Sequence, residues 1–425
     1  MDARPASWSQ QADWGRAGLA VLAACAVFAV AWTVVHFGFY ADNHIVDTPV
    51  YQRYGDAIAG GQVPYRDFTI EYPPAAVPLF AVPSRIVSRG APQSSYDRVF
   101  GFLRAICGAA LDALVALTLV RDRATTSRLV AGCALTALAP LALGSVLLTR
   151  FDLWPAALVA AATCALVYGR DRLALGTLGL GIAAKIYPAA LLPIFVAFVW
   201  KRRGRREALV ALGVAVAVVA VCVLPLAGLS PHGVWESSLR QTSRPLQIET
   251  IGSAFLLALH QVAGLGLTMA SSHGSQNLAG RLPDALAVTL GVLEAVALVA
   301  IWVWFARGPA EPGRLFRACA AAICAFIVFG KVLSPQVLIW LVPLVALVRG
   351  RRGLAAGCVL VACLVLTQVW FPYRYWRLAL QFDAVASWLV VVRDLGLVAL
   401  LAVLLWPSGV RGELGRAGSP APQRP

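Results

Sequence analysis

Charged residues are scarce in this 425-residue chain, of which 13% is charged and 59% hydrophobic. Ordinary soluble domains carry about 25% charged residues, so this composition excludes a soluble protein. Apolar stretches of about 16 to 25 residues separate the charged clusters, and about 20 apolar residues span a bilayer as a helix. The sequence therefore predicts an all-α polytopic membrane protein with about twelve transmembrane helices.

Cysteine pairs and the common catalytic motifs are also lacking. The nine Cys all fall within the apolar stretches and include no CxxC pair, which argues against disulfides and zinc sites. There is no P-loop, no GxGxxG before a helix, no HExxH and no GxSxG, so nucleotide hydrolysis and the use of soluble nucleotide-sugars have no support. We predict no cofactor and no metal ligands, and leave open whether a divalent metal takes part.

Lysine is rare even though the chain is basic. The formal net charge is +15, and of 36 basic residues only Lys185, Lys201 and Lys331 are Lys. The basic residues form short clusters between apolar segments, which is the orientation pattern of membrane proteins rather than a nucleic-acid surface. The abundance of Arg, Ala and Gly indicates a GC-rich bacterial genome, so we expect a bacterial plasma membrane protein.

The basic clusters predict the topology, because they tend to stay in the cytoplasm. With Arg4 and Arg16 inside, residues 17–38 cross outward and 99–120 return, so 39–98 form a long first external loop with short interfacial helices. We expect further crossings at 129–149, 153–169, 207–228, 284–306, 316–333, 336–349, 353–371 and 387–407. Both termini are then cytoplasmic.

Three segments need a separate interpretation. Residues 173–200 are interrupted by Lys185 and Pro188, and only a short helical hairpin keeps the later basic clusters inside. Residues 229–283 form a second external region, in which 251–269 is expected to be an interfacial or re-entrant helix. Residues 1–407 thus make one polytopic domain, and the Gly-, Pro- and Arg-rich tail at 408–425 is expected to be disordered and cytoplasmic.

Unusual polar residues gather on the expected external face. The first loop has six carboxylates among aromatic residues: Asp42, Asp47, Asp56, Asp67, Glu71 and Asp97. A short helix is expected to start at Thr48-Pro49, and the Pro-rich apolar segment 72–86 to lie at the outer interface, as a lid over a cavity would. Nucleotide-activated sugars are scarce outside the cell, so this placement favours a lipid-carried substrate.

An ordered set of motifs resembles a known family. The motifs are Asp47-x-x-Val50-Tyr51, Gly60 or Gly61 followed by Pro64-Tyr65-x-Asp67, Glu71-Tyr72-Pro73-Pro74, Lys185-x-x-Pro188 and Ser334-Pro335-Gln336. Together they look like the GT-C glycosyltransferases of glycosyltransferase family 87 and cover residues 40–340. The resemblance implies a GT-C-like bundle and transfer of a hexose, commonly mannose, from a polyprenyl-phosphate donor to a lipid or glycan acceptor on the extracytoplasmic face.

By this resemblance Asp47 matches the catalytic base of the family. One carboxylate accepts the proton of the acceptor hydroxyl while the oxygen attacks the anomeric carbon opposite the phosphate, which inverts the configuration. The alternative role of Asp47 is an N-terminal cap for the helix that follows. Asp42 is the alternative base, although its spacing departs from the tight acidic pairs of many GT-C enzymes.

The leaving phosphate needs cations at headgroup depth. Lys185, Lys331 and Arg150 are the candidates, because each lies near the outer end of an apolar segment. The alternatives are lysines that reach back to the outer surface, and a surface ion pair between Arg150 and Asp152.

Sugar and acceptor contacts are expected from both external regions. Glu71 and Tyr72 suit a sugar, because a carboxylate binds hydroxyls and an aromatic face stacks on a pyranose, although they could also form only a tight proline turn. Arg244, Gln247 and Glu249 are expected near the acceptor, with a purely structural role as the alternative.

Two other functions fit parts of this pattern. Buried charges and a broken helical hairpin also occur in secondary transporters and lipid flippases. Transporter sites lie near the membrane midplane between repeated halves, whereas the unusual residues of this chain gather at one face and no internal repeat is evident. A third possibility is a homologue without catalytic activity.

Overall fold

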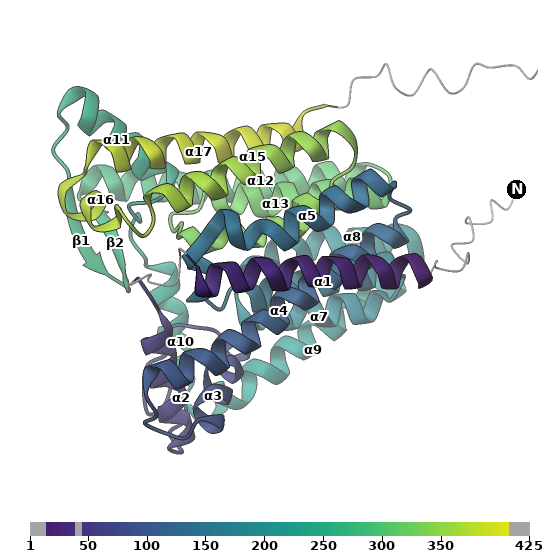
Figure 1. Ribbon diagram of the computed structural model, residues 1–425, viewed down its shortest axis with the longest axis horizontal. Helices are drawn as coiled ribbons and strands as arrows, with labels where there is room; N and C mark the ends of the chain where they lie inside the picture. Colours follow the sequence, from purple (N-terminus) through teal and green to yellow (C-terminus); the bar gives the residue numbers. More distant parts are fainter. Residues whose placement is uncertain (1–13, 39–44, 408–425) are drawn as a thin grey trace, which may run out of the picture.

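The computed structural model describes residues 14–38 and 45–407; Arg4, Asp42 and the tail at 408–425 lie outside this part of the chain. Seven helices of the described residues are long and apolar enough to cross a membrane. They are α1 (Trp14–Phe37), α4 (Gln93–Arg121), α5 (Thr126–Leu143) continued by η2 (Gly144–Leu148), α9 (Arg205–Leu229), α12 (Arg281–Arg307), α15 (Gly350–Trp370) and α17 (Ala384–Leu405). They form one bundle (Figure 1).

The other expected crossings fall on shorter helices. These are α6 (Leu153–Val167), α7 (Asp171–Ala184), α8 (Leu192–Arg203), α13 (Pro312–Val328) and the pair η4 (Pro335–Trp340) and α14 (Val342–Ala346). Each is shorter than the roughly 20 residues that cross a bilayer, and α13 is buried on nearly all sides. A polytopic all-α membrane fold therefore agrees with the structure, while the number of twelve spans stays a prediction.

The segment around Lys185 contains two helices with a break between them. Helix α7 ends at Ala184, the 3-10 helix η3 (Tyr187–Leu191) follows, and α8 continues to Arg203. Arg203 at the end of α8 lies 3.5 Å from Asp171 at the start of α7. The two helices therefore run in opposite directions, with Lys185 at the turn.

Side-chain contacts join the arginine clusters at one end of the bundle, which we call the arginine end and define by Arg128, Arg172, Arg203, Arg317 and Arg349. Arg128 and Arg349 both pair with Asp122, Arg172 pairs with Glu207, and Arg317 donates to carbonyls at the end of α17. Figure 1 shows the start of α1 and the ends of α8 and α17 at this end.

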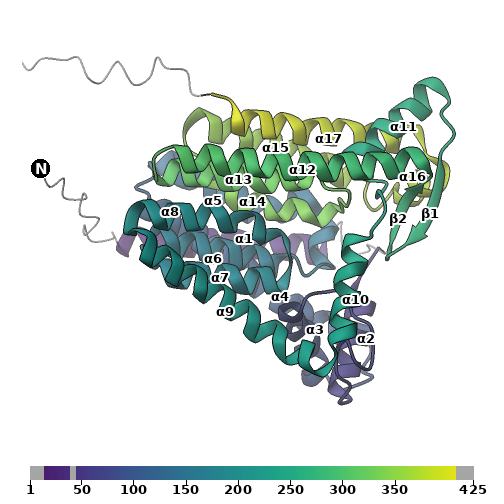
Figure 2. The same ribbon diagram turned by 180° about the vertical axis from the view of Figure 1, so that it is seen from behind.

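The smaller elements cover the opposite end of the bundle. They are α2 (Thr48–Ala59), η1 (Pro74–Ala76), α3 (Val77–Ile86), α10 (Pro231–Thr242), α11 (Ile251–Ala263), β1 (Thr268–Ser272), β2 (Ser275–Ala279) and α16 (Tyr375–Gln381). Figure 2 shows them from behind, with α2, α3 and α10 in one group and β1, β2, α11 and α16 in another. Both external regions expected from the sequence thus lie at one end.

One two-stranded β-hairpin is added to the otherwise helical fold of the described residues, and the helix expected at 251–269 is shorter than predicted. Helix α11 stops at Ala263, and β1 and β2 pair antiparallel from Thr268↔Ala279 to Ser272↔Ser275. His273 and Gly274 connect the strands with φ values of 54° and 65°, as a two-residue hairpin turn requires. The apolar stretches of the sequence do not indicate the hairpin, because its strands are rich in Ser and other small polar residues.

An aromatic cluster holds the first loop in place. Tyr51 of α2 stacks on Phe80 of α3 with ring centroids 4.5 Å apart, and Phe151 lies 5.4 Å from Phe80 and 5.0 Å from Tyr72. Phe151 belongs to the turn between η2 and α6. The start of α2 is therefore fixed against this turn, and aromatic pairs of this geometry contribute about 0.5 to 1.5 kcal/mol each beyond their burial.

Candidate functional site

Asp47 occupies the N-cap position of α2 but does not cap it. Its side chain makes no capping hydrogen bond. Instead, one carboxylate oxygen forms an ion pair with Nη1 of Arg150, and the Tyr51 hydroxyl lies 3.4 Å from the other oxygen. The Asp47 side chain keeps 32% of its surface exposed, whereas that of Arg150 keeps 9%. The carboxylate therefore faces a buried cation and is still open to solvent on one side.

Arg150 lies among several ionisable groups. Burial lowers the pKa of its guanidinium to about 10, and the charges of Asp152 and Glu249 act in the opposite direction. Burial also raises the pKa of Glu249 to about 8, against the effect of Arg393 and Arg150. At neutral pH Arg150 is charged and Glu249 is mostly protonated, so Asp47 is the anion in direct contact with Arg150.

Lys185 is held in a buried ion pair with Asp152. Its Nζ donates to Oδ1 of Asp152 over 2.6 Å, and Nε1 of Trp340 donates to the same oxygen over 2.8 Å. The ammonium group lies 4.7 Å from the ring centroid of Phe151 and 5.0 Å from that of Trp340, and Tyr187 stacks on Trp340 at 4.0 Å. Aromatic faces and a carboxylate together stabilise a cation out of water.

These contacts correct two alternatives from the sequence. Arg150 and Asp152 do not form a surface pair with each other: Arg150 pairs with Asp47, Asp152 pairs with Lys185, and both Arg150 and Asp152 are buried. Lys185 does not reach back to the surface, because its ammonium group bonds to Asp152 inside the protein. Sequence reasoning assigned no role to Trp340, and it considered Asp152 only as a surface partner of Arg150, not as the partner of Lys185.

Arg244 connects the first loop to the β-hairpin. Its Nη2 donates to the carbonyl of His273 over 2.9 Å and to Oγ of Ser275 over 3.3 Å. Burial lowers the pKa of the Arg244 guanidinium, and the charges of Glu71 and Tyr72 in the first loop partly offset this effect. Three of the expected sugar and acceptor residues are thus brought together where the two external regions meet.

Gln247 and Lys331 form a neighbouring group. Gln247 donates from Nε2 to Oγ of Ser334 over 3.0 Å and from its backbone to the Lys331 carbonyl over 3.0 Å. The Nζ of Lys331 donates to the carbonyl of Thr242 over 2.6 Å. The hydrogen bonds of Lys331 thus go to the segment before the hairpin, so Lys331 is not brought into contact with Asp47 as Arg150 is.

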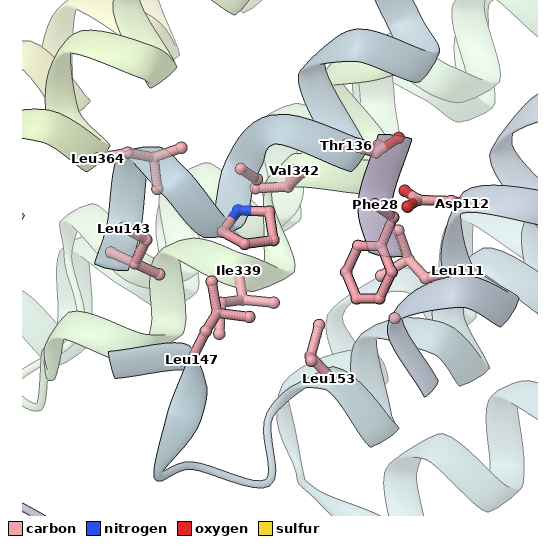
Figure 3. Close-up of a pocket in the computed structure, with 13 residues that line it drawn as sticks. Phe28, Leu111, Asp112, Thr136, Leu143, Leu147, Leu153, Ile339, Val342 and Leu364 are labelled. Atoms are coloured by element: carbon pink, nitrogen blue, oxygen red, sulfur yellow. The ribbon is translucent and has the colours of Figure 1, made fainter. Parts of the chain in front are cut away.

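A small apolar cavity lies beneath the turn that carries Arg150. Its lining includes Leu147 and Leu153 on either side of the turn, Ile339 beside Trp340, and the polar side chains of Asp112 and Thr136. Figure 3 shows Asp112 and Thr136 together on one side of it. The cavity of about 20 Å³ has room for about one water molecule. It is therefore too small to accommodate a hexose or a lipid phosphate.

Comparison with known proteins places the chain in a family. The family model of glycosyltransferase family 87 matches residues 68–335, more than half of the chain. No curated protein matches. The matched segment includes Glu71, Arg150, Lys185 and Lys331 but begins after Asp47. Together with the seven long apolar helices, this match shows that the chain belongs to glycosyltransferase family 87 and is a multi-pass membrane glycosyltransferase.

Proposed function

We propose that this chain transfers a hexose, with mannose as the first candidate, from a polyprenyl-phosphate donor to a lipid or glycan acceptor. The transfer inverts the anomeric configuration and uses Asp47 as general base. The supporting observation is the Asp47 carboxylate, which does not cap its helix and instead lies, partly exposed, against buried Arg150. Family membership favours transfer over the transport of a lipid.

Asp47 would take the proton of the acceptor hydroxyl as that oxygen bonds to the anomeric carbon. The bond between this carbon and the phosphate oxygen breaks, and its electron pair leaves with the polyprenyl phosphate. The ion pair with Arg150 and the contact with the Tyr51 hydroxyl would hold the Asp47 carboxylate in a fixed orientation. Asp42 lies outside the described residues and stays the alternative base.

The donor phosphate gains negative charge in this step, from a singly charged diester to a monoester with up to two charges. Cations that already lie at the site stabilise this change, because they need no reorganisation during the reaction. Lys185 and Arg150 are the proposed phosphate ligands, since each is buried beside a fixed carboxylate and has donor hydrogens left over. Lys331 is proposed as a further ligand of the donor phosphate, nearer the outer surface.

The acceptor side is proposed at the junction of the two external regions. Glu71 and Tyr72 would contact the hexose, while Arg244, Gln247 and Glu249 would bind hydroxyl groups of the acceptor. Support comes from the position of Arg244 between Glu71 and the β-hairpin. A mostly protonated Glu249 has an O–H that can donate to a hydroxyl oxygen.

The proposed orientation has both termini in the cytoplasm of a bacterium and the site on the extracytoplasmic face of the plasma membrane. Support comes from the arginine end, which lies opposite the end that carries α2 (Figure 1), the helix that Asp47 precedes. A Lys201→Cys variant at the arginine end should react with a membrane-impermeant thiol reagent only from the cytoplasmic side. Labelling of intact cells at this position would contradict the orientation.

Product analysis tests the function. Membranes from an overexpressing strain are incubated with labelled polyprenyl-phosphate mannose or glucose, and the labelled product is identified by mass spectrometry. We expect a new glycoside of opposite anomeric configuration with wild-type protein and with Asp67→Asn, whose carboxylate pairs with Arg66 at the surface. A product that is equally abundant in membranes without the protein would rule out this activity.

A further inference from the structure

A second cavity, which is polar, lies at the arginine end, away from the groups proposed for transfer. It has a volume of about 570 Å³ and is lined by Gly169, Arg170, Asp171, Arg172, Leu173, Arg203 and Glu207. These residues come from the connection between α6 and α7, the start of α7, the end of α8 and the start of α9. With three arginines and two carboxylates, its formal charge is +1.

The arginines of this cavity have donors left after their ion pairs. Arg172 binds Glu207 through Nε and Nη2 at 2.8 Å and 2.9 Å, which leaves Nη1 free of that pair. Arg203 pairs with Asp171 through Nε at 3.5 Å. Arg170 lines the same cavity and is exposed. Guanidinium groups that converge in this way match the oxygens of a phosphate.

We call Leu173, Leu209 and Val210 the apolar rim, because Leu173 lines the cavity and the other two follow its lining residue Glu207 on α9. Leu173, which lines the cavity, is 62% exposed, and Leu209 and Val210 on the first turns of α9 are also exposed. Helix α9 is among the least buried of the long helices, with 11% of its most apolar stretch buried. A ligand in the cavity thus meets cations at one end and a lipid-facing helix surface at the other.

We propose that this cavity binds the phosphate headgroup of an anionic phospholipid, whose acyl chains lie along Leu173 and the exposed face of α9. Inorganic phosphate has no apolar part that could contact the rim, whereas a phospholipid has acyl chains. The rim therefore favours a lipid as the source of the phosphate. Basic pockets between helices at the cytoplasmic surface are suited to anionic headgroups. The inference does not depend on the transfer reaction.

A lipid titration tests the site. The purified full-length protein in neutral detergent is titrated with dioctanoyl phosphatidylglycerol while its thermal unfolding temperature is recorded, and dioctanoyl phosphatidylcholine and inorganic phosphate serve as comparison ligands. We expect a saturable rise with phosphatidylglycerol that neither comparison ligand reproduces. Arg170→Gln and Arg203→Gln should each raise the apparent Kd about fivefold, the effect expected of one arginine near a lipid surface.

The matched control is Arg351→Gln, which removes an exposed arginine of the same end without touching the cavity. An equal loss of affinity in this variant would mean that diffuse surface charge attracts the lipid, and would overturn the site. An unchanged Kd in both cavity variants, or an equal rise with inorganic phosphate, would also contradict it. Arg170→Gln leaves both ion pairs in place, so the test does not depend on whether Arg203→Gln folds.

Discussion

The ion pair between Lys185 and Asp152 allows a prediction that separates stability from catalysis. An Asp152→Asn substitution keeps the shape of the side chain and an oxygen that can accept from Trp340, but it removes the negative charge beside Lys185. Lys185 then either stays charged in the interior or loses its proton. Both outcomes destabilise the fold, and the second also removes a cation proposed to hold the donor phosphate.

The size of the effect follows from the burial of the pair. Removing one partner of a buried ion pair costs about 3 to 5 kcal/mol. The Asp152 side chain is 1% exposed and that of Lys185 19%, so partial hydration of the lysine favours the lower value, about 3 kcal/mol. If a charge-assisted contact to phosphate is lost as well, donor use should fall about 10- to 100-fold.

The assay compares Asp152→Asn, Lys185→Met and the double variant. Unfolding is followed by denaturant titration in mixed micelles, and donor use by the initial rate of hexose transfer. We expect each single variant to lose stability and the double variant to regain most of it, because removing both charges leaves no unpaired ion. Transfer should stay low in all three variants.

The exposed Asp284 supplies the control, since Asp284→Asn should change stability by less than about 1 kcal/mol. Two results would refute the reasoning. The first is a double variant that is as unstable as the sum of the single variants. The second is full transfer activity in the double variant, which would leave the ion pair with a structural role alone.

Three further predictions rest on other contacts. Gly144→Ala should destabilise the protein by about 1 to 3 kcal/mol in denaturant titration, because Gly144 has a φ of 66° and an added Cβ would collide with the Gln368 side chain. Gly291→Ala is the control, since its added Cβ meets open space and should not destabilise the protein. Glu249 has a folded-state pKa of about 8 against an ordinary value of 4.5, so its contribution to stability is complete below about pH 4.5 and is lost as the pH rises to 8. The unfolding temperature of the wild type should therefore fall over this range, and that of Glu249→Gln should fall less. Lys331→Met should raise the donor KM by about threefold to tenfold, since a partly exposed ammonium contributes less than a buried one, and an unchanged KM would leave this lysine with only its carbonyl contact.

Local sequence signals predicted the parts of the fold that depend on neighbouring residues. The Thr48-Pro49 start of α2 and the break at Lys185 each follow from residues a few positions apart. The β-hairpin could not be predicted in this way, because its strands lack apolar alternation and β2 also pairs with the segment before α11. Hydropathy therefore predicted helices and missed a polar sheet.

The candidate site shows a different limit. The family resemblance singled out Asp47, and their positions near the outer ends of apolar segments singled out Arg150 and Lys185. For Asp152 the sequence offered only a surface pair with Arg150, as an alternative. The actual partners are distant in the chain: Asp152 and Trp340 are 188 positions apart. Pairing inside a protein depends on which groups lose water together, and this is decided by tertiary packing rather than by spacing in the sequence.

Asp47 is the central residue of the proposed reaction, and one rate measurement tests it most directly. Purified wild-type protein, Asp47→Asn and the surface control Asp67→Asn are compared for initial transfer from labelled polyprenyl-phosphate hexose at saturating acceptor. Loss of a general base lowers rates by about 10²- to 10⁴-fold, so Asp47→Asn should fall within this range while its donor KM stays within about threefold of the wild type. Transfer by Asp47→Asn within about tenfold of the wild-type rate would contradict its role as general base.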